Sequence, residues 1–228
     1  MVQLLKHRLA FAALAVVVVL AAVPGWANQV QVYSQAPDFL GLYASQNDTA
    51  TGGFGSFATA YDDFTLASAT TITQVNWVGG YYNPQSAGSI TAWTVGFFAD
   101  NAGIPGSLLA SFNFAGNGGE TFLQNDTIGD PTYSYTEMLS FNAAAGTKYW
   151  LAVMPDLAFP PQWGWTSSSQ GDGTSYQVYF GLGSSNPTDL AFSLYETQNS
   201  TTPEPGSMML LGTGIIGLAG ILRRKLGA

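Results

Sequence analysis

The chain has 228 residues with a formal net charge of −8, one histidine and no cysteine. These counts exclude disulfides, thiol nucleophiles and cysteine-ligated zinc. Between residues 28 and 202, thirteen acidic side chains stand against one cation, Lys148, which gives a net charge of −12 without any histidine or arginine. Such a region lacks the imidazole of a catalytic triad and repels phosphate backbones, so we expect no nucleic-acid partner.

Residues 1–27 have the pattern of a secretory signal peptide. A cationic start precedes fifteen apolar residues, 9–23, and Pro24 then breaks the predicted helix. Gly25 and Ala27 are the small residues that a signal peptidase needs, so we predict cleavage after Ala27. The alternative is an uncleaved anchor, but the apolar run is short for a hydrocarbon core of about 30 Å.

The middle of the chain reads as short strands separated by turns. Residues 28–56 form a lead-in segment rich in Gln, Asn, Ser and Gly, with room for an edge strand, and residues 57–198 show no helical periodicity. Period-two segments predict nine strands, at residues 57–66, 70–78, 90–99, 108–114, 132–141, 148–154, 164–168, 175–181 and 190–196. Short strands with frequent Gly, Pro, Asn and Asp turns favour an all-β fold, a single antiparallel β-sandwich.

A pattern of aromatic and turn residues also carries a resemblance. It runs from Asp62-Asp63-Phe64 through Trp77-x-Gly79, Gly103-x-Pro105-Gly106, Tyr149-Trp150-Leu151 and Trp163-Gly164-Trp165 to Asp189-Leu190-Ala191-Phe192. The pattern is similar to jelly-roll-like β-sandwich modules of bacterial secreted and surface proteins. These modules have no agreed activity, so the resemblance implies a fold rather than a function.

Two aromatic pairs are candidates for contact with glycans, because indole and phenol rings stack on the C–H faces of sugar rings. Tyr81 and Tyr82 precede Asn83-Pro84 in a predicted loop, where one ring is expected to be exposed. Trp163 and Trp165 lie two residues apart on a predicted strand and therefore share one face. The alternative for this second pair is that both rings belong to the core.

Oxygen-rich positions raise the question of a structural calcium ion. Asp62, Asp63, Asp100 and Asn101 offer the hard ligands that calcium prefers, in a region with a large negative charge. The alternative is that these side chains form turns by bonding to nearby backbone amides. No cofactor is required by any motif in the chain.

Glycoside hydrolysis is the one enzyme class that this composition permits, because two carboxylates suffice for it. The candidate glutamates within the predicted sandwich are Glu120 and Glu137. Their spacing does not mark them as a catalytic pair. We therefore expect a protein without enzymatic activity.

The last part of the sequence contains three elements in a fixed order. Residues 199–207 form a polar linker with the tripeptide Pro203-Glu204-Pro205, and residues 208–228 form a predicted transmembrane helix with a basic tail. The prolines prevent a helix from starting before Gly206, so the tripeptide is expected to be extended and accessible. The tail contains the cluster Arg223, Arg224 and Lys225, which stays cytoplasmic under the positive-inside rule.

This order resembles the PEP-CTERM sorting signal of Gram-negative bacteria that make extracellular polysaccharide. The resemblance implies that an exosortase, a membrane-embedded transpeptidase-like enzyme, cuts near the tripeptide and releases or transfers the domain before it. Pro203, Glu204 and Pro205 then serve as the recognition residues, and the basic cluster serves as the membrane stop. A plain tail anchor is the alternative.

Together these features predict an exported protein that is held briefly at the inner membrane and then sorted to the cell surface or extracellular matrix. We expect a structural or adhesive component associated with exopolysaccharide, as in a biofilm. The alternative function is a lectin-like or carbohydrate-processing β-sandwich. The expected partners are signal peptidase, an exosortase-like enzyme and extracellular polysaccharide.

Overall fold

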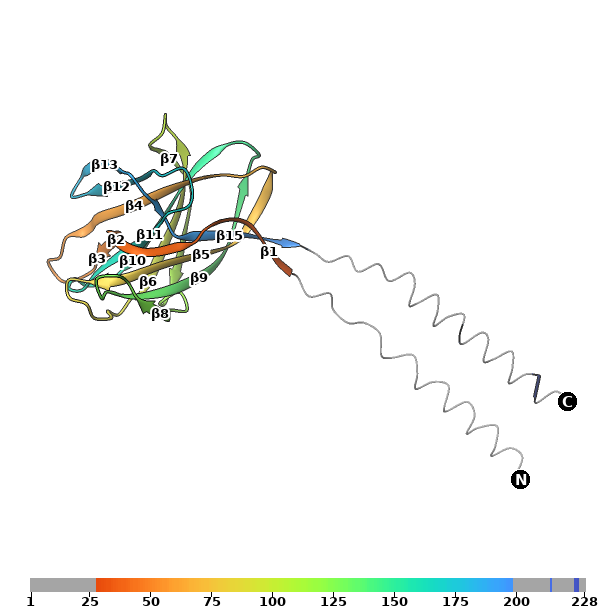
Figure 1. The fold of residues 1–228 in the computed structure, drawn as a ribbon, viewed down its shortest axis with the longest axis horizontal. Coiled ribbons are helices and arrows are strands. Elements are labelled where there is room, and N and C mark those ends of the chain that lie inside the picture. Colours follow the sequence, from red (N-terminus) through yellow and green to blue (C-terminus); the bar gives the residue numbers. More distant parts are fainter. Residues whose placement is uncertain (1–27, 199–213, 215–223, 226–228) are drawn as a thin grey trace, which may run out of the picture. The chain divides into compact units, whose positions relative to one another are not determined.

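A computed structural model describes residues 28–198 together with residues 214, 224 and 225. Between residues 28 and 198 it contains fifteen strands and no helix, and the strands form two sheets (Figure 1). Residues Gln29–Gln198 make one compact unit. The predicted all-β fold is therefore confirmed.

The first sheet has eight strands and is organised around the long strand β5. This strand pairs with β9 along one side and with β15 and β11 along the other, while β8 pairs with β9 and both β2 and β14 pair with β11. Its strands are β1 (Asn28–Gln35), β2 (Pro37–Ala44), β5 (Thr70–Tyr82), β8 (Thr121–Asn125), β9 (Pro131–Ala143), β11 (Gln162–Ser168), β14 (Asp189–Leu190) and β15 (Phe192–Gln198).

The second sheet has seven strands in the order β13-β12-β4-β3-β10-β6-β7. All of its pairings are antiparallel except the single bridge between β10 and β3. Its strands are β3 (Gln46–Asp48), β4 (Gly55–Thr65), β6 (Ala92–Asp100), β7 (Pro105–Ala115), β10 (Lys148–Asp156), β12 (Ser175–Tyr179) and β13 (Leu182–Asn186).

An aromatic core joins the two sheets. The rings of Trp77 and Trp93 meet edge to face with centroids 4.8 Å apart, and Trp93 meets Trp163 in the same way at 5.0 Å. Tyr135 stacks on Trp77 at 5.8 Å. Each such pair contributes about 0.5–1.5 kcal/mol beyond the area it buries, so these rings stabilise a sandwich that has no disulfides.

The structure confirms the nine predicted strand regions and adds strands that the sequence pattern did not predict. The lead-in segment, residues 28–56, contains β1, β2 and β3, which pair into both sheets, so the sandwich begins at β1 rather than at residue 57. β8 and β13 were also not predicted. All five residues of β8 and four of the five in β13 are exposed, so neither strand shows the alternation that marks a half-buried strand.

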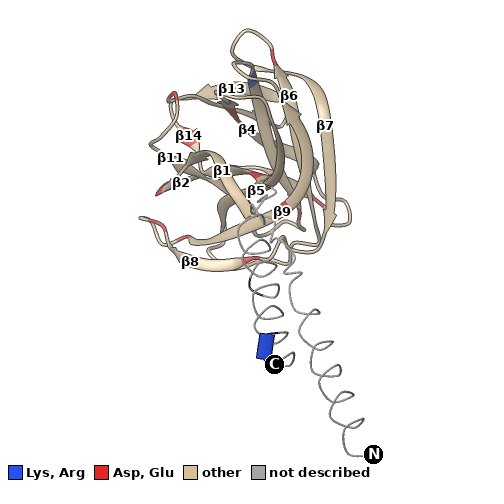
Figure 2. Ribbon diagram, turned by 90° about the vertical axis from the view of Figure 1, so that its right-hand side faces the viewer, with Lys and Arg blue, Asp and Glu red and all other residues tan. Residues whose placement is uncertain are grey.

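The two ends of the described unit lie on neighbouring strands. β1 and β15 are adjacent in the sheet order, and the side chains of Gln29 and Thr197 form a 3.0 Å hydrogen bond between them. The first residue of β1 and the last residue of β15 therefore lie at one end of the sandwich, while the turn between β12 and β13 lies at the other (Figure 1). Acidic residues are spread over the sandwich, and Lys148 is the one basic residue among residues 28–198 (Figure 2).

Several predictions fall outside the described residues. They are the signal peptide at 1–27, the linker at 199–207 and, apart from residues 214, 224 and 225, the transmembrane helix and basic tail at 208–228. Among the residues that are described, no helix is long and apolar enough to cross a membrane.

Candidate functional site

A groove of about 290 Å³ lies where the eight-stranded sheet meets β12 of the other sheet, and we define it here as the tyrosine groove. Three strands of the first sheet and one of the second supply its lining. The lining residues are Leu42, Tyr43, Ala44, Tyr82, Gln162, Gln177 and Tyr179. Every polar group in this set is a phenol or an amide, so the lining carries no charged side chain.

Strand register explains why these residues meet. β5 pairs Tyr82 with Gln162 of β11, and β11 pairs Gly164 with Ala44 of β2, so residues from three strands share one sheet face. Gly164 keeps this face open. A Cβ at that position would lie 2.9 Å from the Leu42 Cβ and 3.0 Å from a ring carbon of Tyr82.

The two glutamines of the groove differ in their hydrogen bonds. The amide nitrogen of Gln177 donates to the Ala44 carbonyl at 2.9 Å and so ties β12 to β2. Gln162 is 6% exposed, its side-chain amide makes no hydrogen bond to another described residue, and the polar atoms of that amide reach the solvent. Gln46, also buried, uses both ends of its amide, donating to the Leu157 carbonyl and accepting from the Trp163 backbone. Gln162 therefore keeps an unused donor and acceptor at the groove.

The predicted glycan-contact residues separate into two groups. Tyr82 is half-buried and lines the groove, at the last residue of β5 rather than in a loop. Tyr81, Trp163 and Trp165 are fully buried, so the prediction that they contact glycans is wrong. Consecutive residues of a strand point to opposite faces, which places Tyr81 in the core and Tyr82 outside it. The alternative interpretation of Trp163 and Trp165, as core residues, is confirmed.

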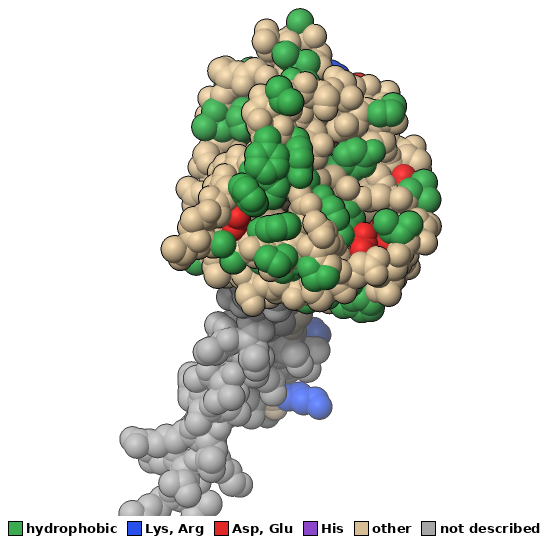
Figure 3. Space-filling model, turned by 90° about the vertical axis from the view of Figure 1, so that its left-hand side faces the viewer, with side chains coloured by type: hydrophobic (Ala, Val, Ile, Leu, Met, Phe, Trp, Pro, Cys, Tyr) green, Lys and Arg blue, Asp and Glu red, His purple; other side chains and the backbone are tan. Residues whose placement is uncertain are grey.

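An aromatic platform adjoins the groove, and Tyr179 belongs to both. The platform consists of the rings of Phe54, Phe57, Phe159, Tyr179 and Phe180, which contact one another with centroids 5.0–6.5 Å apart. Three of these rings are open to solvent, with exposures of 60% for Phe54, 53% for Phe180 and 42% for Tyr179. Figure 3 shows that hydrophobic side chains gather on the face at this end of the sandwich.

A second hollow, of about 350 Å³, lies over β1, β5, β9 and β15. Some of its polar groups are already paired with one another. The hydroxyls of Ser34 and Ser193 share a 2.8 Å hydrogen bond, and Asn76 accepts from the Gln74 amide at 2.8 Å. This hollow therefore offers fewer free groups to a ligand than the tyrosine groove does.

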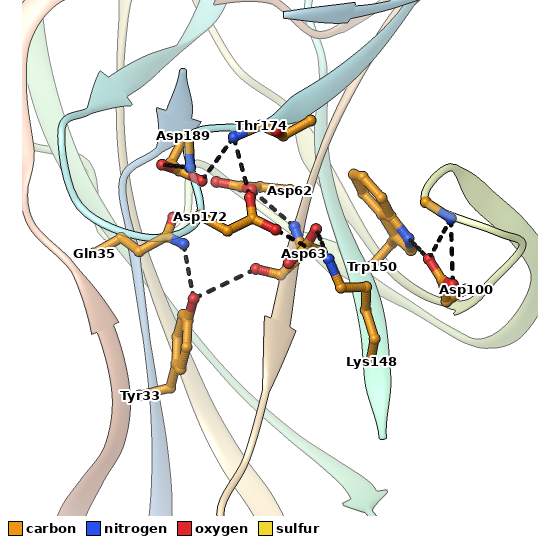
Figure 4. Close-up of polar contacts among 12 residues, drawn as sticks. Tyr33, Gln35, Asp62, Asp63, Asp100, Lys148, Trp150, Asp172, Thr174 and Asp189 are labelled. Carbon is orange, nitrogen blue, oxygen red and sulfur yellow. Dashed lines mark hydrogen bonds and ion pairs between the residues drawn. The ribbon is translucent and has the colours of Figure 1, made fainter. Parts of the chain in front are cut away.

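The predicted calcium ligands do not converge on one point. Asp62 and Asp63 are consecutive on β4, so their side chains leave the strand on opposite faces. Asp63 bonds to Lys148 at 2.7 Å, and the Asp100 carboxylate accepts from Trp150 Nε1 at 2.9 Å and from the Gly103 backbone (Figure 4). Among the described residues there is no group of three or more acidic or histidine side chains that could hold a metal ion. The calcium prediction is corrected accordingly, and Asp100 is a turn residue.

Lys148 is the centre of the outward-facing part of this network. Its ammonium bonds to Asp63 at 2.7 Å and to Asp172 at 3.0 Å, and it lies 5.9 Å from the centre of the Trp150 ring. Partial burial works against the ammonium, but its two carboxylate partners raise the pKa of Lys148 above its ordinary value. The single cation of residues 28–198 is thus paired with two carboxylates of the same domain.

Asp62 lies on the inner face of β4, fully buried beside Asp189. Its carboxylate accepts from the backbone N–H groups of Leu190 and Asp63, and with the Gln35 amide nitrogen turned toward it, from Gln35 at 2.7 Å. Asp189 accepts from the backbone of Gly173 at 2.8 Å (Figure 4). Burial raises the pKa of Asp62 well above its ordinary value, and the neighbouring charge of Asp189 adds to that shift.

The two glutamates considered for hydrolysis have different surroundings. Glu120 accepts hydrogen bonds from the hydroxyls of Tyr81 and Tyr135, and Tyr135 in turn accepts from Trp163 Nε1 at 3.1 Å. Glu137 is half-buried on β9, and burial raises its pKa. Neither glutamate lines the tyrosine groove.

Most residues of the groove and platform were not predicted from sequence. Gln162, Gln177 and Tyr179 look like ordinary polar or aromatic strand positions, because the burial of an amide depends on residues far away in the chain. Phe180-Gly181 offered one signal. A glycine after a period-two segment is typical of a hairpin turn, although we predicted one strand running through Gly181.

Comparison with known proteins identifies a single segment of the chain. No curated protein matches the sequence. Residues 201–225 match the PEP-CTERM protein-sorting motif. The match covers the predicted recognition residues Pro203, Glu204 and Pro205 as well as the basic cluster that ends at Lys225. The chain therefore carries a PEP-CTERM protein-sorting motif, which implies export through an exosortase system to the cell envelope.

Proposed function

We propose that this protein is a non-enzymatic adhesive component of an extracellular polysaccharide matrix, which binds polysaccharide through the tyrosine groove. Signal peptidase and an exosortase-like enzyme process it in a Gram-negative cell, and the segment at residues 208–228 tethers the precursor to the inner membrane. The processed sandwich then acts at the cell surface or in the matrix.

One observation carries this proposal: the groove combines aromatic rings with a side-chain amide that bonds to no other described residue. Tyr82 and Tyr179 supply phenol rings, and Gln162 supplies a donor and an acceptor without a partner among residues 28–198. Sugars present C–H faces and hydroxyl groups side by side, and this combination matches both. A ligand that displaces water from this amide must replace its hydrogen bonds, which favours a polyhydroxylated surface.

The position of the groove supports the same role. The exosortase signal follows β15, whose last residue lies at the end of the sandwich opposite the β12–β13 turn. The tyrosine groove and the platform include residues of β12 and of that turn. A domain attached or released beyond β15 leaves this end free to contact matrix polymers.

Binding is tested with the processed protein, purified from the surface fraction of its host, and the exopolysaccharide of the same cells. We expect the polysaccharide to retard the protein in affinity gel electrophoresis. Tyr82→Ala and Gln162→Met should each weaken this binding about tenfold, which corresponds to about 1.4 kcal/mol. Tyr195→Phe, on β15 at the other end of the sandwich, is the control and should bind normally.

Retardation that is equal in wild type and in both groove variants would show that the polysaccharide binds elsewhere. No retardation of the wild type would contradict the adhesive function. The carbohydrate-processing alternative makes a different prediction, namely loss of polysaccharide turnover in Glu137→Gln. Turnover by the wild-type protein would by itself refute a non-enzymatic role.

A further inference from the structure

We infer that the tyrosine groove and the aromatic platform form one extended site for an uncharged polysaccharide chain. This inference rests on the proposed function and specifies its ligand. The groove binds one part of the chain through amides and phenols, and the platform stacks against sugar rings further along it.

The charge distribution selects an uncharged ligand. The groove lining contains no lysine or arginine to balance an anionic sugar, and the single cation of residues 28–198, Lys148, is bound by Asp63 and Asp172. Acidic side chains lie near the groove instead. Asp130 contributes to the raised pKa of Tyr82, after burial and Tyr179, and Asp38 contributes to that of Tyr43, after burial. A uronic acid placed here would be repelled, whereas a neutral hexose would not.

Tyr179 makes the groove and the platform continuous. Its side chain lines the groove, and its ring meets Phe180 edge to face at 5.0 Å and Phe57 at 5.9 Å. Phe54 then meets Phe180 at 5.5 Å. Phe57 is buried, whereas Phe180 and Phe54 are exposed, so a ligand that fills the groove must be a chain of several sugars to reach these two rings.

Phe180 has a left-handed backbone conformation, which costs less conformational energy for Asn, Asp or Gly than for Phe. Its φ is 46° and that of Gly181 is 77°, so both central residues of the β12–β13 turn are left-handed. Such turns favour Asn, Asp or Gly at the first position, and a residue like Phe costs about 1 kcal/mol there. The backbone N–H of Phe180 donates to the Phe57 carbonyl at 2.7 Å, which holds the exposed ring against the platform. The positive φ and the exposed ring together make Phe180 a candidate contact residue.

The substitution Phe180→Asn separates folding from binding, because asparagine accepts the left-handed conformation. We expect this variant to fold and to unfold cooperatively, because the relief of the backbone strain offsets part of the loss of the ring contacts with Phe54, Phe57 and Tyr179. Its affinity for a long neutral polysaccharide should fall about tenfold, while its affinity for a short oligosaccharide that fills only the groove should be unchanged. Gln162→Met should lower the affinity for the long polysaccharide and for the short oligosaccharide by the same factor.

The ligand class is tested with two purified polymers, a neutral glucan and the polyuronate alginate, by affinity gel electrophoresis and calorimetry on the processed protein. We expect binding to the glucan and none to alginate. Preference for alginate, or equal binding of both, would overturn the inference while leaving the adhesive function intact. Binding of neither polymer, and of no host exopolysaccharide, would overturn the proposed function as well.

A second copy of the chain is the competing occupant of the platform. Sedimentation of the wild type and of Phe180→Asn distinguishes the two cases. If the wild type and Phe180→Asn are both monomers, and the variant has lost affinity for the long polysaccharide, the result supports polysaccharide as the occupant of the platform. A wild-type dimer that Phe180→Asn dissociates would overturn the inference.

Discussion

At the scale of single residues, Asp62 and Asp63 show how strand geometry separates chain neighbours. Asp63 faces outward and bonds to Lys148, while Asp62 faces inward and lies buried beside Asp189. The sequence presents them as equivalent oxygen ligands, which is why we predicted a shared calcium site. The pleat of β4 decides otherwise, because consecutive side chains leave opposite faces.

The buried position of Asp62 predicts a pH dependence of stability. Its pKa in the folded protein lies above that in the unfolded chain, so the folded protein binds more protons between these two values. The free energy of unfolding should therefore be greatest below the unfolded pKa, near 4, and decrease as the pH rises toward the folded pKa. Each unit between the two pKa values corresponds to about 1.4 kcal/mol.

The comparison with Asp62→Asn, which cannot titrate, isolates this contribution. Urea unfolding at several pH values between about 4 and 8 should give a wild-type free energy of unfolding that declines relative to the variant as the pH increases. A difference between the two proteins that stays constant across this range would contradict the assignment.

At the scale of elements, the N-terminal strands β1, β2 and β3 are integral parts of the two sheets rather than a separate leading segment. β2 pairs with β11 beside the groove, β3 bridges β4 and β10, and Tyr33 of β1 stacks on Phe192 at 5.3 Å. Their sequence is rich in Gln, Asn and Ser, although residues 29–32 of β1 alternate as Gln-Val-Gln-Val, a signal that could have predicted this strand. β3 has only three residues, too few to show a pattern. The pairing of these strands with distant partners determines their conformation.

This integration predicts that residues 28–56 cannot be removed. Deleting them from the processed protein should abolish the cooperative thermal transition, because β11 and β4 lose partner strands and Tyr33 and Tyr43 no longer cover the core. Circular dichroism during heating measures the transition. A shortened protein that unfolds cooperatively near the wild-type temperature would show that the lead-in segment is dispensable.

At the scale of the whole molecule, the sorting motif and the tyrosine groove occupy separate parts of the chain. The sorting motif at residues 201–225 follows the last strand, whereas the groove is assembled from β2, β5, β11 and β12. A change in the motif should therefore alter where the protein goes without altering the proposed binding of polysaccharide.

Glu204→Ala is the corresponding prediction. We expect the variant to accumulate as an unshortened, membrane-retained precursor, because the recognition tripeptide has lost its carboxylate. Intact-mass measurement on membrane, surface and medium fractions distinguishes the precursor from the processed form. Gln162→Met is the matched control and should be processed normally. Normal shortening of Glu204→Ala would contradict exosortase recognition of this residue.

The local pattern of the sequence determined the sorting motif, the all-β class and the positions of nine strand regions. A sorting motif consists of consecutive residues, and period-two alternation within one strand reflects its one buried face. Both signals are local, so they can be recognised without knowledge of distant contacts. The jelly-roll connectivity stays a prediction. The sequence alone left open whether Trp163 and Trp165 were core or surface residues.

Only the tertiary structure decided which polar and aromatic residues lie at the groove and which of them lack a hydrogen-bond partner in the protein. Tyr82 and Gln162 are eighty residues apart and become neighbours through the register of β5 and β11, and Gln177 and Tyr179 join them from the other sheet. The unpaired amide of Gln162 follows from what surrounds it, because burial and hydrogen bonding are properties of packed strands. For the same reason Lys148, the lone cation of residues 28–198, proved to be an internal partner of Asp63 and Asp172.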